Sequence, residues 1–139
     1  MRRHLAASLL MLLAVLTKRV GLAVGSHDVY VNVVGGFTLE EPAIDLGVAA
    51  AIASSYREKT IPPDMALIGE VGLSGELRPV SRLGLRVREA AKLGFKRCIV
   101  PKAGGGATIK AELETSGLPA DFHVFASSSL AVALEVALH

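Results

Sequence analysis

The stretch that most constrains the fold of this chain is EEPAIDLGVAAAIASSY, residues 40–56. It opens with two carboxylates and a proline, which suits the first turn of a helix, and then becomes almost continuously apolar. We predict a helix from Ile44 to Tyr56, and its many alanines allow whatever packs against it to approach closely. Asp45, three residues after Pro42, is the one charge that the apolar pattern does not explain.

The acidic residues at the start of this helix have two explanations. Glu40, Glu41 and Asp45 form one set of carboxylates that acid–base catalysis could use. Negative charge in a first turn also complements the positive end of the helix dipole, and each exposed carboxylate contributes about 0.3–1 kcal/mol in this way. We favour the dipole explanation, because acidic residues are common at helix starts, and keep Asp45 as a candidate buried anchor.

The first 26 residues imitate a secretory signal, since Arg2 and Arg3 precede an apolar stretch from Leu5 to Leu16. No small-residue cleavage site follows. Instead, basic residues occupy the last turn and Gly21 closes the helical pattern. We therefore favour a buried first helix over a signal peptide, and its apolarity around most of the circumference indicates cover on more than one side.

The remaining segments alternate between strand and helix patterns without a regular repeat. They are a strand over 28–37, a buried strand over 65–71 with a hairpin return through Ser74-Gly75, a helix from a Ser81 cap to Leu93, a strand over 96–101, a loop entering a helix over 104–117, a strand over 121–125 and a closing helix to Leu138. This irregular order predicts an α+β fold with a mixed β-sheet packed with helices, in one domain over 1–139.

Composition limits the functions that such a domain can have. The chain is 51% hydrophobic but only 4% aromatic, so surfaces on which bases or sugars could stack are scarce. Its net charge of +2 is far from the excess that marks many nucleic-acid binders, so a basic patch has to be local. Cys98 is the only cysteine, which excludes an internal disulfide and a cysteine-based zinc site and indicates a reducing compartment, the cytoplasm.

Three other features suggest chemistry only weakly. Gly104–Gly106 is not followed by the Lys-Ser/Thr pair of a P-loop, so a flexible loop is favoured. The histidines have no metal-ligand spacing, and we expect His123 to be structural. Cys98 lies in a short apolar strand with no histidine nearby, which favours a buried and inert thiol. We expect neither a metal nor a cofactor in this chain.

Four segments follow one another as they do in a known family: DVYVNVVGG, EPAIDLGVAAAIASSY, PPDMALIGEVGLSGELRPVSRL and REAAKLGFKRCIVPK. In this order they resemble the C-terminal Lon protease-like domain of the bacterial RadA family, also called Sms, whose members are RecA-like DNA repair and recombination factors. The resemblance covers nearly the whole chain, and GEVGLSGELRPVSR is its most specific part. RadA-like proteins also carry a four-cysteine zinc motif and a RecA-like ATPase with a P-loop. Neither motif occurs here, so we expect the chain to be a fragment.

The same register places the chain beside the Lon peptidases. In those enzymes a serine follows the proline that opens this helix, and a lysine early in the helix after the hairpin activates it. The resemblance places Ala43 and Gly84 at these two positions, which implies a non-enzyme with a degenerate dyad. Asp45 falls where the peptidases have a glycine, and its carboxylate would repel a developing oxyanion. Helix interiors, a turn and a cap explain the other serines considered, Ser54, Ser55, Ser74 and Ser81.

The resemblance implies two functions: assembly of subunits into a ring, as a homo-hexamer, and DNA contacts added to the RecA-like ATPase ring of the parent chain. These would serve repair, recombination and branch migration. Arg78, Arg82 and Arg86 support DNA binding locally, because clustered arginines bind phosphate and the last two lie at i and i+4. A solvated face with Arg88 and Glu89 as ion-pair partners explains them equally well.

Arg19 is a further DNA-binding candidate, although with Lys18 it also complements a helix end. The scarcity of aromatic residues and of groove-reading motifs predicts binding that does not depend on DNA sequence. We expect self-association to use the apolar first helix and the alanine-rich second helix. Two alternatives stay open: an interaction module that never contacts nucleic acid, and a residual serine peptidase.

Overall fold

The computed structural model of the chain describes residues 11–22, 42–102 and 117–139. The described strands form a three-stranded parallel sheet in the order β1-β4-β5 and a two-stranded antiparallel sheet, β2-β3. Their bounds are β1 (Met65–Leu67), β2 (Glu70–Val71), β3 (Leu77–Arg78), β4 (Arg97–Pro101) and β5 (His123–Ser127). Helices accompany both kinds of strand pairing, which confirms the predicted α+β class. The predicted strand over 28–37 and the predicted loop and helix over 104–116 lie outside the described residues.

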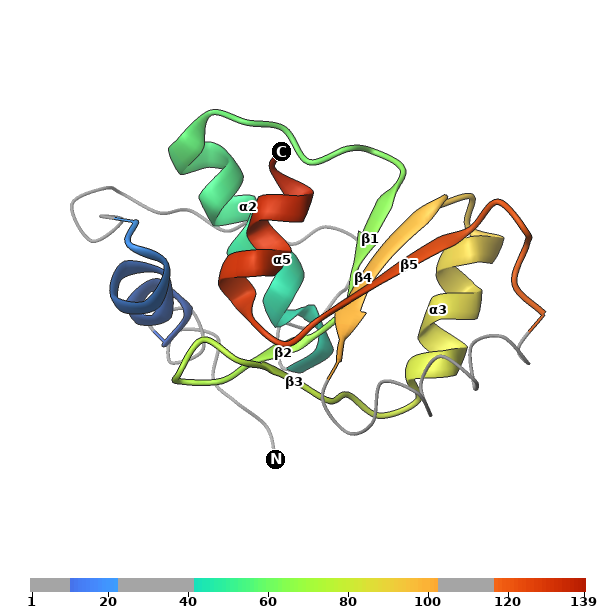
Figure 1. The fold of residues 1–139 in the computed structure, drawn as a ribbon, viewed down its shortest axis with the longest axis horizontal. Helices are drawn as coiled ribbons and strands as arrows, with labels where there is room; N and C mark the ends of the chain where they lie inside the picture. The colour runs from blue at the N-terminus through green and yellow to red at the C-terminus, as the bar shows by residue number, and fades with distance from the viewer. Residues whose placement is uncertain (1–10, 23–41, 103–116) are drawn as a thin grey trace, which may run out of the picture.

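Helical elements cover both faces of the parallel sheet (Figure 1). They are η3 (Pro42–Ile44), α2 (Asp45–Arg57), α3 (Leu83–Lys92), α5 (Leu130–Ala137) and a first helix over 11–15 that continues as η1 (Leu16–Val20). Figure 1 shows α2 and α5 on one side of the sheet and α3 on the other. No described helix is both long and apolar enough to cross a membrane.

The sheet separates two hydrophobic cores, because successive strand residues point to opposite faces. Ile99 of β4 belongs to the first core, whereas its neighbours Cys98 and Val100 belong to the second. The first core lies between the sheet, α2, α5 and the first helix, and it includes Leu16, Leu46, Leu77, Leu130 and Leu134. The second core lies on the side of α3 and consists of Ala43, Ile68, Leu83, Val87, Cys98, Val100 and Phe122.

The alanine-rich helix α2 occupies the middle of the first core, as its sequence predicts. Ala49, Ala50 and Ala53 are 0% exposed and belong to one cluster with Ala133 and Leu134 of α5. The first helix adds Leu12, Val15 and Leu16 to the same cluster. Gly21 ends it with a left-handed φ of 82°, which confirms the predicted stop.

The predicted single strand over 65–71 is wrong, because the chain leaves the parallel sheet in the middle of it. The Ile68 N–H still bonds to the Ile99 carbonyl of β4, at 3.0 Å. Gly69 instead pairs with the start of α2: its N–H donates to the Ala43 carbonyl at 2.9 Å, and its carbonyl accepts from Leu46 at 3.0 Å. Residues 70–71 then form β2 and pair with β3, so the predicted hairpin return is confirmed.

Two predicted boundaries also move. Arg82, and not Ser81, occupies the N-cap position of α3, with a left-handed φ of 57° and no side-chain cap hydrogen bond. The last strand begins at His123, because the Phe122 N–H is used in a turn with the Pro119 carbonyl, at 3.0 Å. Ser129 caps the closing helix, since its Oγ accepts from the Val132 N–H at 3.2 Å.

The described residues have two distinct edges along the strand direction. The starts of β1, β4 and β5 and the end of α2 lie at the upper edge in Figure 1, which we call the amino edge. The β2–β3 hairpin and the start of α3 lie at the lower edge with the strand ends, which we call the carboxyl edge. The hairpin is tied there to the start of α5, since Leu77 N–H donates to Ser128 and Leu130 N–H to Gly75.

Candidate functional site

The carboxyl edge is the candidate location of a site, because ligands of open parallel sheets bind beyond the carboxyl ends of the strands. Three predicted features meet there: the start of α2 with Ala43 and Asp45, the hairpin with Arg78, and the start of α3 with Gly84 (Figure 1). The chain arrives at this edge from β1 and passes through the hairpin into α3. Arg78 and Gly84 therefore lie on one continuous segment, whereas Ala43 and Asp45 precede β1 and are brought to this edge by the fold.

Asp45 is an internal anchor and not an exposed catalytic group. Its side chain is 2% exposed, and its Oδ2 accepts a hydrogen bond from the Val71 N–H at 3.0 Å. Together with the two bonds of Gly69, this contact fastens the first turn of α2 to the segment that joins β1 to β2. The interpretation of Asp45 as a buried anchor is confirmed, whereas Glu40 and Glu41 lie outside the described residues.

The starts of α2 and α3 meet in the second core. Ala43 is 4% exposed and belongs to the same cluster as Leu83 and Val87 of α3. Gly84 is buried in the first turn of α3. The fold therefore brings together the two regions that the resemblance assigns to a dyad, and the side chains present there are a methyl group and a hydrogen atom.

Two of the predicted DNA-binding residues flank the first turn of α3. Arg82 is exposed at the N-cap, and its carbonyl accepts from the Arg86 N–H at 3.0 Å. Arg86 is half-buried, and its Nε donates to the Ser81 carbonyl at 2.8 Å. The first turn of α3 contains no acidic residue. The two arginines therefore flank the positive end of a helix dipole, in a first turn that contains no carboxylate.

Arg78 lies in a different electrostatic setting. It is exposed on β3, directly opposite Glu70 of β2 in the antiparallel register. Residues directly opposite each other in such a pair have neighbouring side chains on the same face. The hairpin also carries Glu76, whose Oε1 accepts from the Ser74 N–H at 3.1 Å. Sequence reasoning missed Glu70, although a turn centred on Ser74 pairs residue 70 with residue 78.

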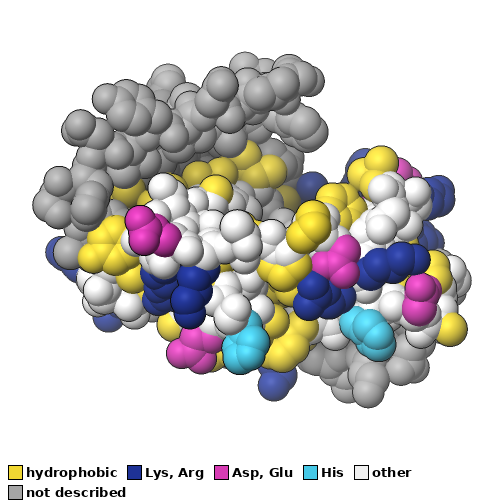
Figure 2. Space-filling model, turned by 90° about the horizontal axis from the view of Figure 1, so that it is seen from above, with side chains coloured by type: hydrophobic (Ala, Val, Ile, Leu, Met, Phe, Trp, Pro, Cys, Tyr) yellow, Lys and Arg dark blue, Asp and Glu magenta, His cyan; other side chains and the backbone are white. Residues whose placement is uncertain are grey.

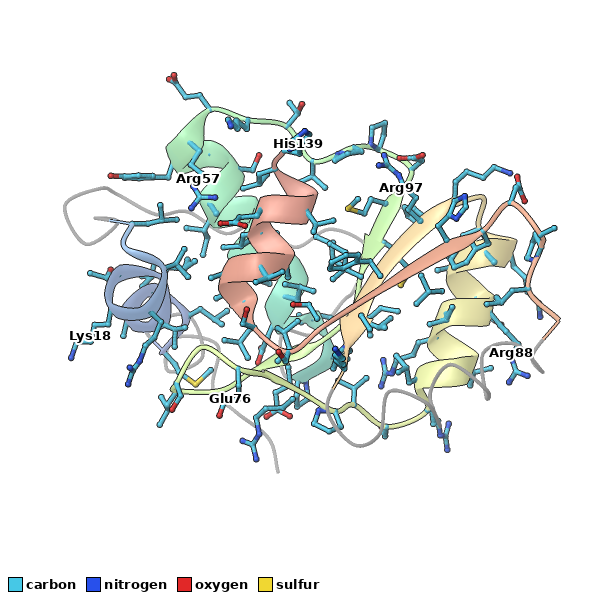
Figure 3. All side chains as sticks on the ribbon, in the orientation of Figure 1. Lys18, Arg57, Glu76, Arg88, Arg97 and His139 are labelled. Atoms are coloured by element: carbon cyan, nitrogen blue, oxygen red, sulfur yellow. The ribbon has the colours of Figure 1, made fainter. Side chains whose placement is uncertain are left out.

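Arg19 reaches the same hairpin from the first helix. A Cβ placed on Gly75 would lie 3.0 Å from the Arg19 Cβ and 3.4 Å from its Cγ, so the arginine stem packs across the hairpin turn. Gly75 also has a left-handed φ of 80°, which a side chain rarely adopts. Lys18, by contrast, projects away from the described body (Figure 3). Of the two basic residues, Arg19 is the one placed at the carboxyl edge.

The amino edge carries charges of both signs. Lysines, arginines, acidic residues and histidines are interspersed over this face (Figure 2). Arg97 pairs with Asp64 at 2.6 Å and Lys96 with Asp121 at 3.1 Å, and these partners hold the pKa of both carboxyl groups below the usual value. On α3, Glu89 pairs with Lys92 at 3.6 Å, and Arg88 projects outward from the helix (Figure 3).

The remaining candidate groups have little chemistry available to them. Cys98 is 1% exposed, and burial raises the pKa of its thiol to about 12, which confirms an inert side chain. His123 is exposed at the start of β5. Among the residues that the structure describes, no three histidine, cysteine, aspartate or glutamate side chains are grouped closely enough to hold a metal ion.

Comparison with known proteins gives one family and a consistent group of relatives. The model of the family described as subunit ChlI of Mg-chelatase matches residues 12–104. A DNA repair protein RadA from Halalkalibacterium halodurans is 56% identical over 109 residues, which cover 78% of this chain and 24% of the relative. The RadA of Bacillus subtilis is 57% identical over 100 residues, with 72% and 21% covered.

A third relative extends the match along the chain. The DNA repair protein RadA of Listeria monocytogenes is 44% identical over 128 residues, which cover 92% of this chain and 26% of the relative. The chain thus spans about a quarter of the length of the curated relatives it matches.

Proposed function

The chain belongs to the family described as subunit ChlI of Mg-chelatase, and from its RadA relatives we propose that it functions in DNA repair and recombination. In this proposal it is a non-catalytic, Lon protease-like scaffold of a cytoplasmic RadA-like protein. It adds sequence-independent DNA contacts to a RecA-like ATPase and helps to assemble subunits into a ring, a hexamer, for branch migration.

The non-catalytic part of the proposal is supported at the starts of α2 and α3. Acyl transfer by a Ser-Lys dyad needs a nucleophilic oxygen and a base within hydrogen-bond reach. Ala43 and Gly84 provide neither group, although their two helices share the second core. Asp45 adds a buried carboxyl group to the same turn and occupies the Val71 N–H, a backbone donor of the hairpin.

We expect that the double variant Ala43→Ser with Gly84→Lys will also be inactive as a peptidase. The new hydroxyl would be enclosed in the apolar second core, and Asp45 would oppose a developing oxyanion. The measurement is intact mass after incubation with a fluorophosphonate, together with casein cleavage, for the parent and the variant. Stoichiometric labelling of the parent would overturn the non-catalytic proposal, whereas labelling of the variant alone would show that only the two dyad side chains are missing. A serine hydrolase that reacts with the probe is the positive control.

The DNA-binding part rests on the start of α3. Backbone N–H groups at a helix start attract phosphate, and arginine adds charge-assisted hydrogen bonds to it. Here Arg82 and Arg86 stand at a helix start whose first turn has no acidic residue. Such a site contacts only the DNA backbone, so binding should not depend on base sequence.

We expect that replacing Arg78, Arg82 and Arg86 by alanine will weaken DNA binding and flatten its salt dependence. The slope of log K against log salt is negative. For every phosphate that the variant no longer neutralises, this slope should become shallower by about 0.7 for single strands or about 0.9 for duplexes. The measurement is fluorescence anisotropy with mixed-sequence oligonucleotides at several salt concentrations. Comparison of single-stranded and duplex probes also determines which form of DNA is preferred.

The matched control removes the same charge from the amino edge, through Arg57→Ala, Lys59→Ala and Lys92→Ala. Arg57 and Lys92 lie at the ends of α2 and α3, away from the hairpin (Figures 1 and 3). If binding follows overall charge, both triple variants should lose affinity equally. An unchanged slope in the carboxyl-edge variant would exclude the proposed site and leave an interaction module without DNA contact.

One observation is compatible with that alternative. The hairpin presents Glu70 directly opposite Arg78 and carries Glu76 at its turn, so its acidic residues offset the arginine. A surface of this kind suits a protein partner as well as it suits phosphate. The salt titration distinguishes DNA binding from a pure protein-interaction function, because a pure interaction module should not bind single-stranded or duplex oligonucleotides at any salt concentration.

Part of the apolar surface that we expect to support ring assembly is buried within the described residues. The apolar faces of the first helix and of α2 pack within the chain, where Leu16, Ala49 and Ala50 are 0% exposed. These buried residues are therefore not available for contacts between subunits. Among the described residues, the large apolar side chains that remain exposed are those of Tyr56 in α2 and of Leu73, Leu85, Leu93, Phe125 and Val132.

A further inference from the structure

We propose that the outer edge of β5 pairs with the β5 edge of a second copy of this chain, antiparallel and centred on Phe125. β5 lies at one end of the described sheet order β1-β4-β5. The contact would be two-fold and would use the same residues from both copies. It goes beyond the proposed ring, whose head-to-tail contacts use two different surfaces.

The hydrogen bonds at the two ends of β5 determine which backbone groups point outward. The His123 N–H donates to Lys96 of the segment entering β4, and the Ser127 carbonyl accepts from the Lys102 N–H that follows it. In a parallel pair, residues that bond to a given neighbour alternate along the strand. Residues 123, 125 and 127 therefore face β4, and the N–H and C=O groups of Val124 and Ala126 face away from it.

These outward groups are arranged symmetrically about Phe125. A two-fold axis beside residue 125 places Val124 of one copy opposite Ala126 of the other, and each such pair can exchange both hydrogen bonds. It places the two Phe125 residues in the pair without hydrogen bonds, where Cα atoms come within about 4.5 Å and side chains are closest. One register thus uses every outward group of both strands, so a second copy of β5 can satisfy all of them.

The side chains of β5 fit the same partner. Phe125 is 41% exposed although it lies in register with Ile99, which is 0% exposed. A two-fold pairing would bring the two phenyl rings together, and aromatic pairs across strands stabilise sheets. Monomeric proteins protect sheet edges with charged residues or proline, whereas His123–Ser127 contains no lysine, arginine, acidic residue or proline.

Disulfide trapping of the full chain tests the two-fold contact. The Phe125→Cys variant should form a covalent dimer under mild oxidation, because the expected Cα separation lies within the range that a disulfide spans. Native Cys98 can stay, since it is buried. The control is Leu73→Cys on the hairpin, where the replaced side chain is 72% exposed and random collision is more frequent. Equal dimer yields from the two variants would overturn the proposal.

The register can be tested separately. When Val124→Cys and Ala126→Cys proteins with different tags are mixed, the disulfide between the two variants should exceed the disulfides within each variant. A statistical mixture of the three products would contradict the register centred on Phe125.

A proline variant tests whether the contact is strand pairing. Ala126→Pro removes an outward N–H and no bond to β4, so it should lower the trapping yield of Phe125→Cys about tenfold while the thermal melt stays cooperative. An undiminished yield would overturn the proposed strand pairing. An extended peptide that binds β5 in place of a copy would leave Phe125→Cys monomeric, which also overturns it. The contact is independent of the arginines, so failure of DNA binding would leave these results unchanged.

Discussion

Asp45 illustrates how a single side chain can organise the carboxyl edge. Its carboxyl oxygen satisfies the Val71 N–H across 26 residues of sequence, and the side chain is almost completely buried. A buried N–H without a partner would cost about 1–3 kcal/mol. The charge that interrupts an apolar helix in the sequence therefore has a structural function, which is to fix β2 against α2.

We predict that Asp45→Ala will lower the free energy of unfolding by about 1–3 kcal/mol, because it leaves the Val71 N–H unsatisfied. Asp45→Asn keeps an oxygen acceptor at the same position and should cost less. Urea denaturation followed by circular dichroism measures both. Equal losses for the two variants would show that the charge of Asp45, and not its hydrogen bond to Val71, is what stabilises the fold.

At the scale of elements, the sequence pattern identifies what periodicity and turn residues control. The apolar run of α2, the Gly21 stop, the turn at Gly75 and the serine cap of α5 all depend on residues close together in the chain. The break of the strand at Gly69 depends instead on hydrogen bonds to Ala43 and Leu46. Such bonds between distant segments leave no local pattern, which is why the sequence does not predict this boundary.

The candidate site divides in the same way. The sequence shows the arginines as a cluster, and their i,i+4 spacing predicts that Arg82 and Arg86 lie on one helix. In the structure α3 begins at Leu83, so Arg82 occupies the N-cap position just before the helix. The opposition of Glu70 and Arg78 depends on strand register, and register becomes known only when the hairpin turn is located. Sequence therefore identifies the basic residues of the carboxyl edge and misses the acidic residue that faces one of them.

At the hairpin we predict that Glu70→Gln will strengthen DNA binding about two- to threefold at low salt. Two unit charges about 8 Å apart in water interact by about 0.5 kcal/mol, so removing one carboxylate beside Arg78 should help a nearby phosphate by this amount. Fluorescence anisotropy measures the change, and Glu58→Gln at the end of α2 is the charge-matched control. If both variants bind equally, Arg78 does not contact the DNA.

At the scale of the whole molecule, the two edges of the sheet have different electrostatic organisation. Acidic residues at the amino edge pair with basic ones across separate elements: Asp64 precedes β1 and pairs with Arg97 of β4, while Lys96 pairs with Asp121 ahead of β5. These pairs join the starts of the parallel strands. The start of α3 at the carboxyl edge has two arginines and no acidic residue in its first turn. The pairs at the amino edge thus join separate strand starts, whereas at the carboxyl edge Arg78 lies opposite Glu70 within one hairpin.

This organisation predicts how stability responds to acid. The hydrogen bond from Arg97 lowers the pKa of Asp64, and that from Lys96 lowers the pKa of Asp121, both from an ordinary value of 3.8. A carboxyl group whose pKa is lower in the folded state stabilises the fold above its unfolded pKa. That stabilisation is lost as the pH falls through the lowered folded value. We therefore expect the melting temperature to decrease as the pH is lowered below about 4. The decrease should be smaller in the double variant Asp64→Asn with Asp121→Asn, because that variant has no such pairs to lose.

The measurement is differential scanning calorimetry of the parent and this double variant between pH 7 and pH 2.5. Both side chains of each pair are well exposed, so the two proteins should differ only slightly in melting temperature at neutral pH. This difference in melting temperature should become smaller in acid. Replacing Glu58 and Glu135 by glutamine removes the same charge without touching either pair. If that control shows the same narrowing, the acid response reflects net charge over the whole molecule, and the amino-edge pairs are not its cause.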